Sequence, residues 1–165
     1  MTEKNFSWDK FSHGIYLNAS IEKVFEHVAS ATGITKWFIG EAKYYYKNFN
    51  IRLGNEFSKR GDSFLWKWQN KDLELKGLVT ESAENKIFQF TFSPLYLVTI
   101  DLAHEGVRTK LLLTQEYQEG AERNQFNFLN CCTCWVFFLT NLKSVIEHGI
   151  DLRETEATDE MLVNE

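Results

Sequence analysis

The stretch FNFLNCCTCWVFFLTNLKSVIEH, residues 126–148, decides the fold, because neither glycine nor proline interrupts it and Gly149 follows it directly. Apolar residues recur in it at the spacing of a helix, and its 23 residues would extend about 34 Å. Since apolar residues cover more than half of its circumference, we expect the helix to be largely enclosed by the rest of the chain. Its apolar face is made by Phe128, Cys132, Trp135, Leu139, Leu142 and Ile146.

The chain upstream of this helix, from residue 41 to residue 117, changes to a period of two, which indicates half-buried strands. Short turns between consecutive strands favour an antiparallel meander. The enclosing surface is therefore predicted to be a curved sheet. Strands are expected at residues 44–46, 50–53, 63–69, 73–81, 87–93, 95–102 and 110–117, with a turn at residues 104–108.

The N-terminal region begins with a strand that ends at Leu17, followed by two short helices. Ser20 is a suitable N-cap for the first helix, and Glu22 lies in its first turn, where the helix dipole favours an acid. The second helix is expected to carry Ile34, Trp37 and Phe38 and to end at Gly40.

The 165 residues suit one domain, with a core of about residues 10–152 and an acidic tail from residue 153 to residue 165. No repeat or linker divides the chain. In the tail, Met161-Leu162-Val163 is a candidate docking segment for a partner, and fraying is the alternative.

The formal net charge of −5 and the lack of a basic stripe argue against nucleic-acid binding. Residues 1–10 lack the apolar core of a secretory signal. The most apolar window, residues 131–142, is too short to span a bilayer. We therefore expect no membrane span and a cytoplasmic location.

The order of these elements is that of the α+β helix-grip (START-like, SRPBCC) fold, shared by START-like lipid carriers and the birch-pollen allergen class. Residues 15–37 resemble the opening of the family of homologues of the activator of heat-shock protein 90 ATPase, with the apolar pair Val24-Phe25 and then Trp37-Phe38. Gly77-Leu78-Val79 and the aromatic strand after it, Ile87-Phe88-Gln89-Phe90, are similar to the next strands of that family. Where the family commonly has glycine before the helical Trp135, this chain has Cys134.

The resemblance covers about residues 10–152 and implies a binding fold more than an activity. The co-chaperone that names the family resembles this chain only in its smaller C-terminal domain. A chaperone partner is therefore left open and is not implied, and a homodimer is left open as well.

The cysteines and histidines do not form a metal site in the sequence pattern. On a helix Cys131 and Cys134 share a face, and Cys132 points about 100° away. No second cysteine pair completes the four ligands of a structural zinc. We expect core thiols, surface or capping histidines (His13, His27, His104 and His148), and no cofactor.

Catalysis in a cavity would need an inward acid or histidine with a shifted pKa. Four acids near predicted strand ends or faces are candidates, and each is expected to be solvated: Glu41, Glu56, Asp62 and Asp101. An enzyme of the cyclase or dehydratase kind therefore stays an alternative.

Aromatic residues make up 15% of the chain, which is high enough that some rings could line an internal cavity. A filled core is the alternative for each ring. We expect non-enzymatic binding of a small apolar or amphipathic molecule between the sheet and the long helix, with a protein-interaction module as a further alternative. The predicted lining residues are Trp37, Phe38, Phe64, Trp66, Trp68, Phe88, Phe90, Phe92 and Trp135.

Overall fold

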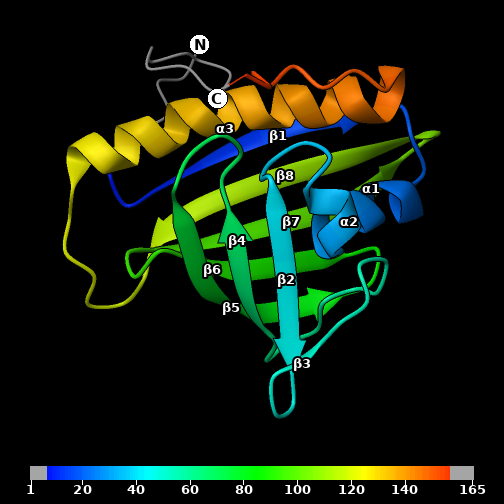
Figure 1. The fold of residues 1–165 in the computed structure, drawn as a ribbon. Coiled ribbons are helices and arrows are strands. Elements are labelled where there is room, and N and C mark those ends of the chain that lie inside the picture. The colour runs from blue at the N-terminus through cyan, green and yellow to red at the C-terminus, as the bar shows by residue number, and fades with distance from the viewer. Residues whose placement is uncertain (1–6, 157–165) are drawn as a thin grey trace.

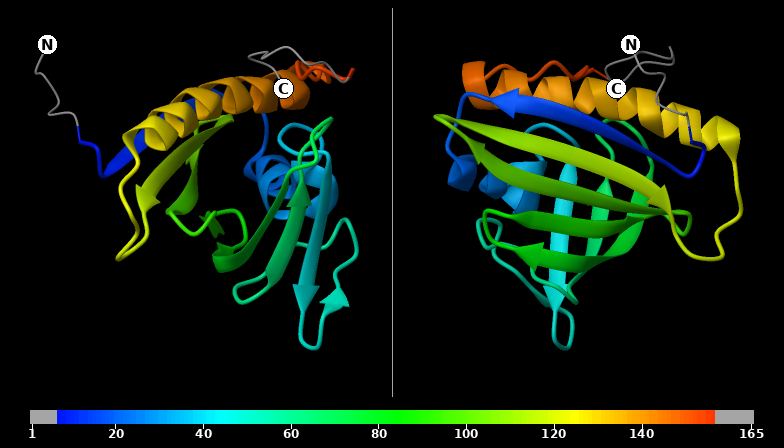
Figure 2. Two further views of the ribbon diagram at one scale, coloured as in Figure 1. Left: turned by 60° about the vertical axis from the view of Figure 1, so that its left-hand side comes forward. Right: turned by 180° about the vertical axis from the view of Figure 1, so that it is seen from behind.

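A computed structural model describes residues 7–156, so the tail segment Met161-Leu162-Val163 lies outside the described residues. Within this range, eight strands form an antiparallel sheet in the order β1-β8-β7-β6-β5-β4-β2-β3. The sheet is strongly curved, and the C-terminal helix lies across its open side (Figures 1 and 2). This confirms the predicted α+β helix-grip fold. The strands are β1 Lys10–Leu17, β2 Glu41–Tyr46, β3 Asn50–Ile51, β4 Ser63–Lys67, β5 Glu74–Ala83, β6 Ile87–Phe92, β7 Tyr96–Glu105 and β8 Arg108–Tyr117.

The helices are α1 Ile21–Ala29, α2 Ala31–Ile34 and α3 Gln125–His148. Ser20 caps α1 as predicted, because its hydroxyl accepts a hydrogen bond from the Lys23 N–H. Gly149 ends α3 in the left-handed region with φ 71°, and its N–H donates to the Val145 carbonyl. The start of α1 and the end of α3 are therefore where the sequence predicted them.

Two local predictions were wrong. Helix α2 ends at Ile34, so Trp37 and Phe38 follow it in a turn, where tertiary contacts position them. The Trp37 indole N–H, for example, donates to the His27 carbonyl at 2.9 Å. The β7–β8 turn is also shorter than residues 104–108, because cross-strand pairing continues to Glu105 and Arg108. Gly106, with φ 61°, makes this tight turn.

Helix α3 is not enclosed as the sequence suggested, because only one of its faces packs on the core. Trp135 and Leu142 are buried on that face, whereas Phe126 is 78% exposed and Leu129 is 55% exposed on the other. Among the described helices, α3 alone is long and apolar enough to cross a membrane by length and composition, with 33% of that window buried. Core helices of globular proteins meet the same criterion.

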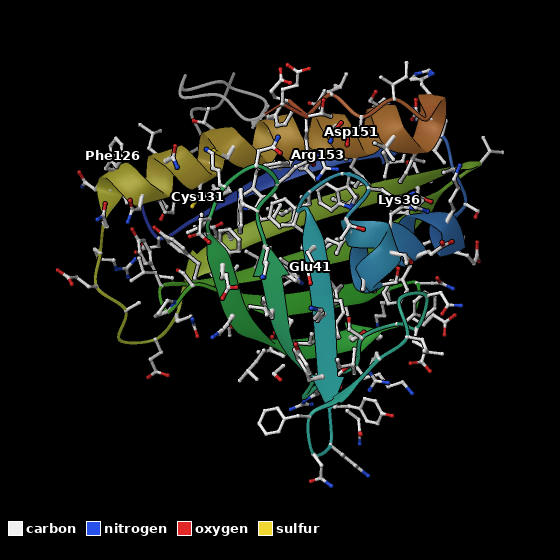
Figure 3. All side chains as sticks on the ribbon, viewed as in Figure 1. Lys36, Glu41, Phe126, Cys131, Asp151 and Arg153 are labelled. Atoms are coloured by element: carbon white, nitrogen blue, oxygen red, sulfur yellow. The ribbon has the colours of Figure 1, made fainter. Side chains whose placement is uncertain are left out.

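The chain after Gly149 turns back along α3 (Figure 1), and Arg153 fixes it there. The buried Arg153 guanidinium donates to the carbonyls of Ile39 and Thr35, each at 2.9 Å. It also forms an ion pair with Asp151 (both labelled in Figure 3). The Asp151 carboxylate accepts a hydrogen bond from Asn141 of α3. The chain beyond the helix is thus tied to α3 and to the segment between α2 and β2.

Candidate functional site on the concave face of the sheet

The nine aromatic side chains predicted as a cavity lining lie in one connected network of rings. Phe38 is its hub, with ring centroids 4.8 Å from Trp135, 5.8 Å from Trp66 and 5.4 Å from Trp37. The Phe64 and Trp66 rings stack at 4.1 Å, and Trp66 lies 5.0 Å from Phe90. The remaining members join through Phe38, Phe90 or one another: Trp68, Phe88 and Phe92.

This ring network is closed in the middle and reaches the surface at one end. Seven of its nine members are at most 3% exposed, whereas Trp68 and Phe92 are only partly buried. These two rings lie 6.3 Å apart at the ends of β4 and β6, and the Phe92 ring is 5.7 Å from that of Trp135 on α3. An apolar molecule would reach the network most directly there, between α3 and the ends of β4 and β6.

A glutamine interrupts the apolar wall on β8. Leu111, Leu113 and Gln115 share one face of this strand, and none of the three is exposed. The Gln115 side-chain carbonyl accepts a hydrogen bond from the Trp135 indole N–H at 2.8 Å. Its Nε2 is buried and makes no hydrogen bond of normal geometry among the described residues, although the Gln115 side chain lies beside the Cys131 thiol, where it opposes the burial that raises the pKa of Cys131. Because the carbonyl end is fixed, the amide donors are held in one direction.

Three more polar atoms of buried side chains on the concave face make no hydrogen bond of normal geometry within residues 7–156: Tyr44 Oη, Trp66 Nε1 and Tyr96 Oη. The Tyr44 phenol lies close to the Trp66 indole and Ser58, and the Tyr96 phenol lies close to Tyr117. Buried polar atoms usually find a hydrogen-bond partner, because leaving one unpaired costs about 1–3 kcal/mol. Burial raises the pKa of both phenols above the usual range, so both are neutral donors at pH 7.

Sequence reasoning missed Gln115, Tyr44 and Tyr96. The sequence did contain a signal, which is the alternation of inward and outward residues along each strand. Each of the three residues stands at an inward, buried position of its strand. A polar residue at a position where the alternation of a strand otherwise places apolar residues is a candidate inward-facing group.

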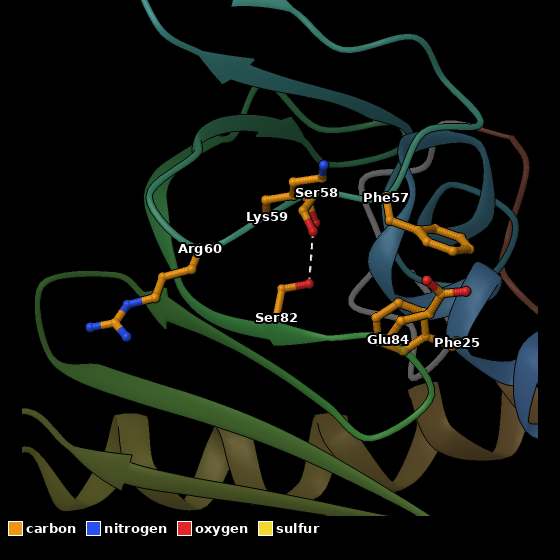
Figure 4. A pocket seen from close by; sticks show the side chains of 7 residues that line it. All are labelled: Phe25, Phe57, Ser58, Lys59, Arg60, Ser82 and Glu84. Atoms are coloured by element: carbon orange, nitrogen blue, oxygen red, sulfur yellow. Dashed lines mark hydrogen bonds between the residues drawn. The ribbon is translucent and has the colours of Figure 1, made fainter.

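A separate open cleft of about 300 Å³ lies between α1, the β3–β4 connection and the β5–β6 hairpin (Figure 4). The rings of Phe25 and Phe57 meet edge to face in it at 5.1 Å, and the Ser82 hydroxyl donates to the Ser58 carbonyl at 2.7 Å. None of the nine predicted residues lines this cleft. Its lining is Phe25, Phe57, Ser58, Lys59, Arg60, Ser82 and Glu84.

The acids singled out in the sequence do not converge. Glu41 pairs with Lys43, Glu56 accepts from the Leu53 N–H, and Asp101 is exposed. Asp62 differs from the prediction of a solvated carboxylate. It is 3% exposed because it forms a two-pronged ion pair with Arg52 and accepts from the Lys59 N–H.

The described histidines and cysteines form no group of three or more potential metal ligands with each other or with acids. His27 is buried, and its Nδ1 lies 2.8 Å from the Lys23 carbonyl, so this nitrogen carries the proton. Burial lowers the pKa of His27, and burial raises the pKa of all three thiols. Cys131 packs against the core as predicted, whereas Cys134 is exposed, so the prediction of core thiols was wrong for Cys134.

The family model of activator of Hsp90 ATPase homolog 1-like proteins matches residues 18–147. The chain belongs to this family. No curated protein matches the sequence. Among solved structures, the chain is similar to SSP2350 from Staphylococcus saprophyticus, with 19% sequence identity and a TM-score of 0.69. The match covers 87% of this chain and 96% of SSP2350.

Two further solved structures are similar to this chain, one of them a dimer and the other a protein from a biosynthetic locus. The Aha1 dimer from Colwellia psychrerythraea has 21% identity and a TM-score of 0.62, with 85% of this chain and 97% of that chain covered. DynU16, a protein of the dynemicin biosynthetic locus, has 16% identity and a TM-score of 0.69, with coverage of 89% of this chain and 50% of that one. At these identities the likeness establishes the fold.

Proposed function

We propose that this chain binds a small apolar or amphipathic molecule between the concave face of the sheet and α3, without a cofactor. The observation that carries the proposal is the buried amide of Gln115, which Trp135 orients and whose Nε2 makes no hydrogen bond of normal geometry among the described residues. Ligand sites are mostly apolar walls with a few fixed polar groups, and this is such an arrangement. The aromatic network supplies the apolar wall.

The chemistry of the unpaired atoms indicates which ligand would fit. Gln115 Nε2, Trp66 Nε1 and the neutral phenols of Tyr44 and Tyr96 can each donate a hydrogen bond. Two arginines of the described chain have little exposure, Arg153 and Arg52, and both are committed to other partners. The site therefore favours uncharged acceptor oxygens, such as carbonyl or hydroxyl groups on an apolar skeleton.

The polar and ionisable side chains available to the proposed site favour binding over catalysis. A cyclase or dehydratase needs a general acid or base within reach of its substrate. Among the described buried acids and histidines, Asp62 is held by Arg52 and His27 hydrogen-bonds within α1. DynU16 belongs to a biosynthetic locus, which keeps the enzymatic alternative worth testing here.

Native mass spectrometry of the purified full chain is the first test, followed by titration with fatty acids, flavonoids and polyketides. We expect a small molecule that is released on denaturation, or binding of an aromatic carbonyl compound that quenches tryptophan fluorescence. Gln115→Met should weaken that binding about tenfold, because one oriented hydrogen bond is lost. A chain that carries no small molecule and binds none of the panel would overturn the proposal.

Gln89→Met is the matched control. Gln89 lies on β6 on the other side of the sheet, where its amide accepts from Thr80 and donates to Thr99, so both of its ends are paired. The same substitution there should cost stability without changing ligand affinity. Equal weakening of binding by both variants would assign the effect to the sheet and not to Gln115.

A second candidate is self-association through the outer face of α3, favoured by one observation. From Gln125 to Leu142 this helix has no charged residue, and Phe126, Leu129 and Val136 are more than half exposed on it (Figure 3 labels Phe126). The Colwellia relative is described as a dimer. Sedimentation velocity should then show a dimer that Leu129→Lys with Val136→Lys makes monomeric, and a monomeric wild type would refute this candidate. We propose the cytoplasm as the place of action for either function.

A further inference from the structure

The turn between β2 and β3 forms a narrow tip that projects from the sheet on the side away from α3 (Figure 1). It is closed by Asn50, whose side-chain amide donates to the Lys47 carbonyl at 2.8 Å. Apolar side chains on and beside this tip are unusually exposed, with Phe49 at 84%, Leu53 at 68% and Ile51 at 56%. An aromatic ring at the end of a turn gains nothing from the core of its own domain.

The backbone of the tip is also strained. Asn48 has φ 59° and Phe49 has φ 60°, and both values lie in the left-handed region. Asparagine tolerates that region, but for phenylalanine it costs about 1–2 kcal/mol. The Phe49 ring contacts no other ring among the described residues and is 84% exposed, so burial of the ring offsets little of this cost. Strain that is held at an exposed apolar residue points to a role outside the fold.

The charge around the tip is opposite to that of the whole chain. The protein has a net charge of −5, whereas residues 41–56 contain three basic residues and two acids, with Lys43 paired to Glu41 and Glu56 accepting from the Leu53 N–H. Arg52 is committed to Asp62 and stacks on the Tyr46 ring at 4.7 Å. Lys47 is exposed on the turn itself. Lys59 and Arg60 are exposed in the turn before β4, the strand that pairs with β2, where Arg60 forms an ion pair with Glu81 at 3.7 Å.

We propose that the β2–β3 tip inserts into the surface of an anionic lipid bilayer. Phe49 and Ile51 would enter the boundary between headgroups and acyl chains, while the exposed side chains of Lys47 and Lys59 remain at the level of the phosphates. Apolar burial and attraction to anionic lipid together stabilise such shallow attachment. Because the chain has a net negative charge, exposed lysines beside an apolar tip favour approach of the tip to an anionic surface.

The shape of the tip favours a bilayer over a protein partner. A stable protein interface buries about 800 Å² on each partner across a surface of matching shape. A short turn with side chains that radiate from it offers no such surface, whereas fluid lipid can close around it from every side. The inference is independent of the proposed ligand site, which lies on the concave face.

Co-sedimentation of the full chain with vesicles tests the proposal. Vesicles of phosphatidylcholine alone are compared with vesicles that contain about 30% phosphatidylglycerol, in about 50 mM and about 500 mM salt. We expect binding to the anionic vesicles at low salt and its loss at high salt. Lys47→Glu combined with Lys59→Glu should reduce this binding about tenfold or more.

Phe49→Gly separates membrane contact from folding. Glycine removes the ring and accepts a positive φ, so the melting temperature should rise by about 2–4 °C while vesicle binding falls about tenfold or more. Val107→Gly is the matched control, because Val107 is 95% exposed on the β7–β8 turn and should not affect binding. A wild type that stays in the supernatant with anionic vesicles, or a Phe49→Gly variant that binds like wild type, overturns the proposal.

Discussion

The indole N–H of Trp135 on α3 donates to the side-chain carbonyl of Gln115 on β8 at 2.8 Å, and both residues are almost fully buried. This bond joins the helix to the sheet inside an otherwise apolar interface. It satisfies one polar atom of each side chain and leaves Gln115 Nε2 without a hydrogen bond of normal geometry to any residue that the structure describes. The bond therefore affects both the stability of the helix–sheet packing and the direction of the proposed ligand donor.

The first prediction is that the two residues are energetically coupled. Trp135→Phe removes the donor and leaves the Gln115 carbonyl buried without a partner, so we expect a loss of about 2–4 kcal/mol in the free energy of unfolding. Gln115→Leu should cost about 1–3 kcal/mol because the indole N–H is then unpaired. The double variant should lose less than the two single losses combined, with a coupling of about 0.5–3 kcal/mol. Urea denaturation of all four proteins measures this, and strict additivity would show that the bond contributes nothing.

The second prediction concerns Gly77, which lies opposite Phe64 in the β4–β5 pair. A Cβ at this position would lie 2.7 Å from Thr91 Oγ1 and 2.8 Å from Phe64 Cε1. Phe64 is stacked on Trp66 and cannot move without disturbing the ring network. Gly77→Ala should therefore destabilise the protein by about 1–3 kcal/mol and shift its tryptophan emission.

Gly14→Ala is the control for this substitution in a strand. A Cβ at Gly14 would lie 3.7 Å from Leu112 Cδ1, an ordinary contact. Thermal unfolding of both variants gives the comparison. If Gly77→Ala melts at or above the temperature of Gly14→Ala, the ring network is looser than the structure indicates.

The sequence was sufficient for those elements of the fold that depend on local pattern. The period of α3, the stop at Gly149 and the alternation in β6 each follow from neighbouring residues alone. The helical period also identified the residues of α3 that pack on the core, because Phe128, Trp135, Leu139, Leu142 and Ile146 are all buried. It could not show that the other apolar residues of the helix stay outside the core. The exposure of Phe126 and Leu129 was hidden for that reason.

The site was less predictable, because its polar groups depend on contacts between distant segments. Strand alternation and the family resemblance together selected the rings, whereas Gln115 owes its fixed orientation to Trp135, twenty residues later in the chain. Asp62 was expected in solvent because a lone carboxylate near a strand end usually is. Its burial depends on Arg52, which the β2–β3 hairpin brings back beside it.

The third prediction is that Arg153 fastens the C-terminal segment to the domain. Arg153→Gln would leave the carbonyls of Ile39 and Thr35 with poorer partners and Asp151 without its cation. We expect a loss of about 2–4 kcal/mol in the free energy of unfolding at pH 7. Arg123→Gln, which breaks an exposed ion pair with Asp9, should cost no more than about 1 kcal/mol.

The same ion pair predicts a dependence on acid. Partial burial acts to raise the pKa of Asp151, but hydrogen bonds from Arg153 and Asn141 outweigh it and hold the pKa below the ordinary 3.8. The stabilisation is therefore complete above the unfolded pKa and is lost as the pH falls through the lower folded value. Wild type and Arg153→Gln should differ less in stability at about pH 2 than at pH 7. A difference that is independent of pH would show that Arg153 acts through the carbonyls alone.

The fourth prediction concerns His27, whose pKa burial lowers from the ordinary 6.5. The charges of Lys36 and Lys23 also lower it, whereas the Lys23 carbonyl and Glu26 oppose the shift. Below about pH 6.5 the unfolded chain binds a proton that the folded chain refuses, so stability should fall as the pH drops from 6.5 toward the folded pKa. His27→Asn keeps a donor for the Lys23 carbonyl but cannot titrate, and it should remove this component of the slope. Urea midpoints of both proteins between pH 5 and 7 measure it, and parallel curves would mean that His27 is not kept neutral by the fold.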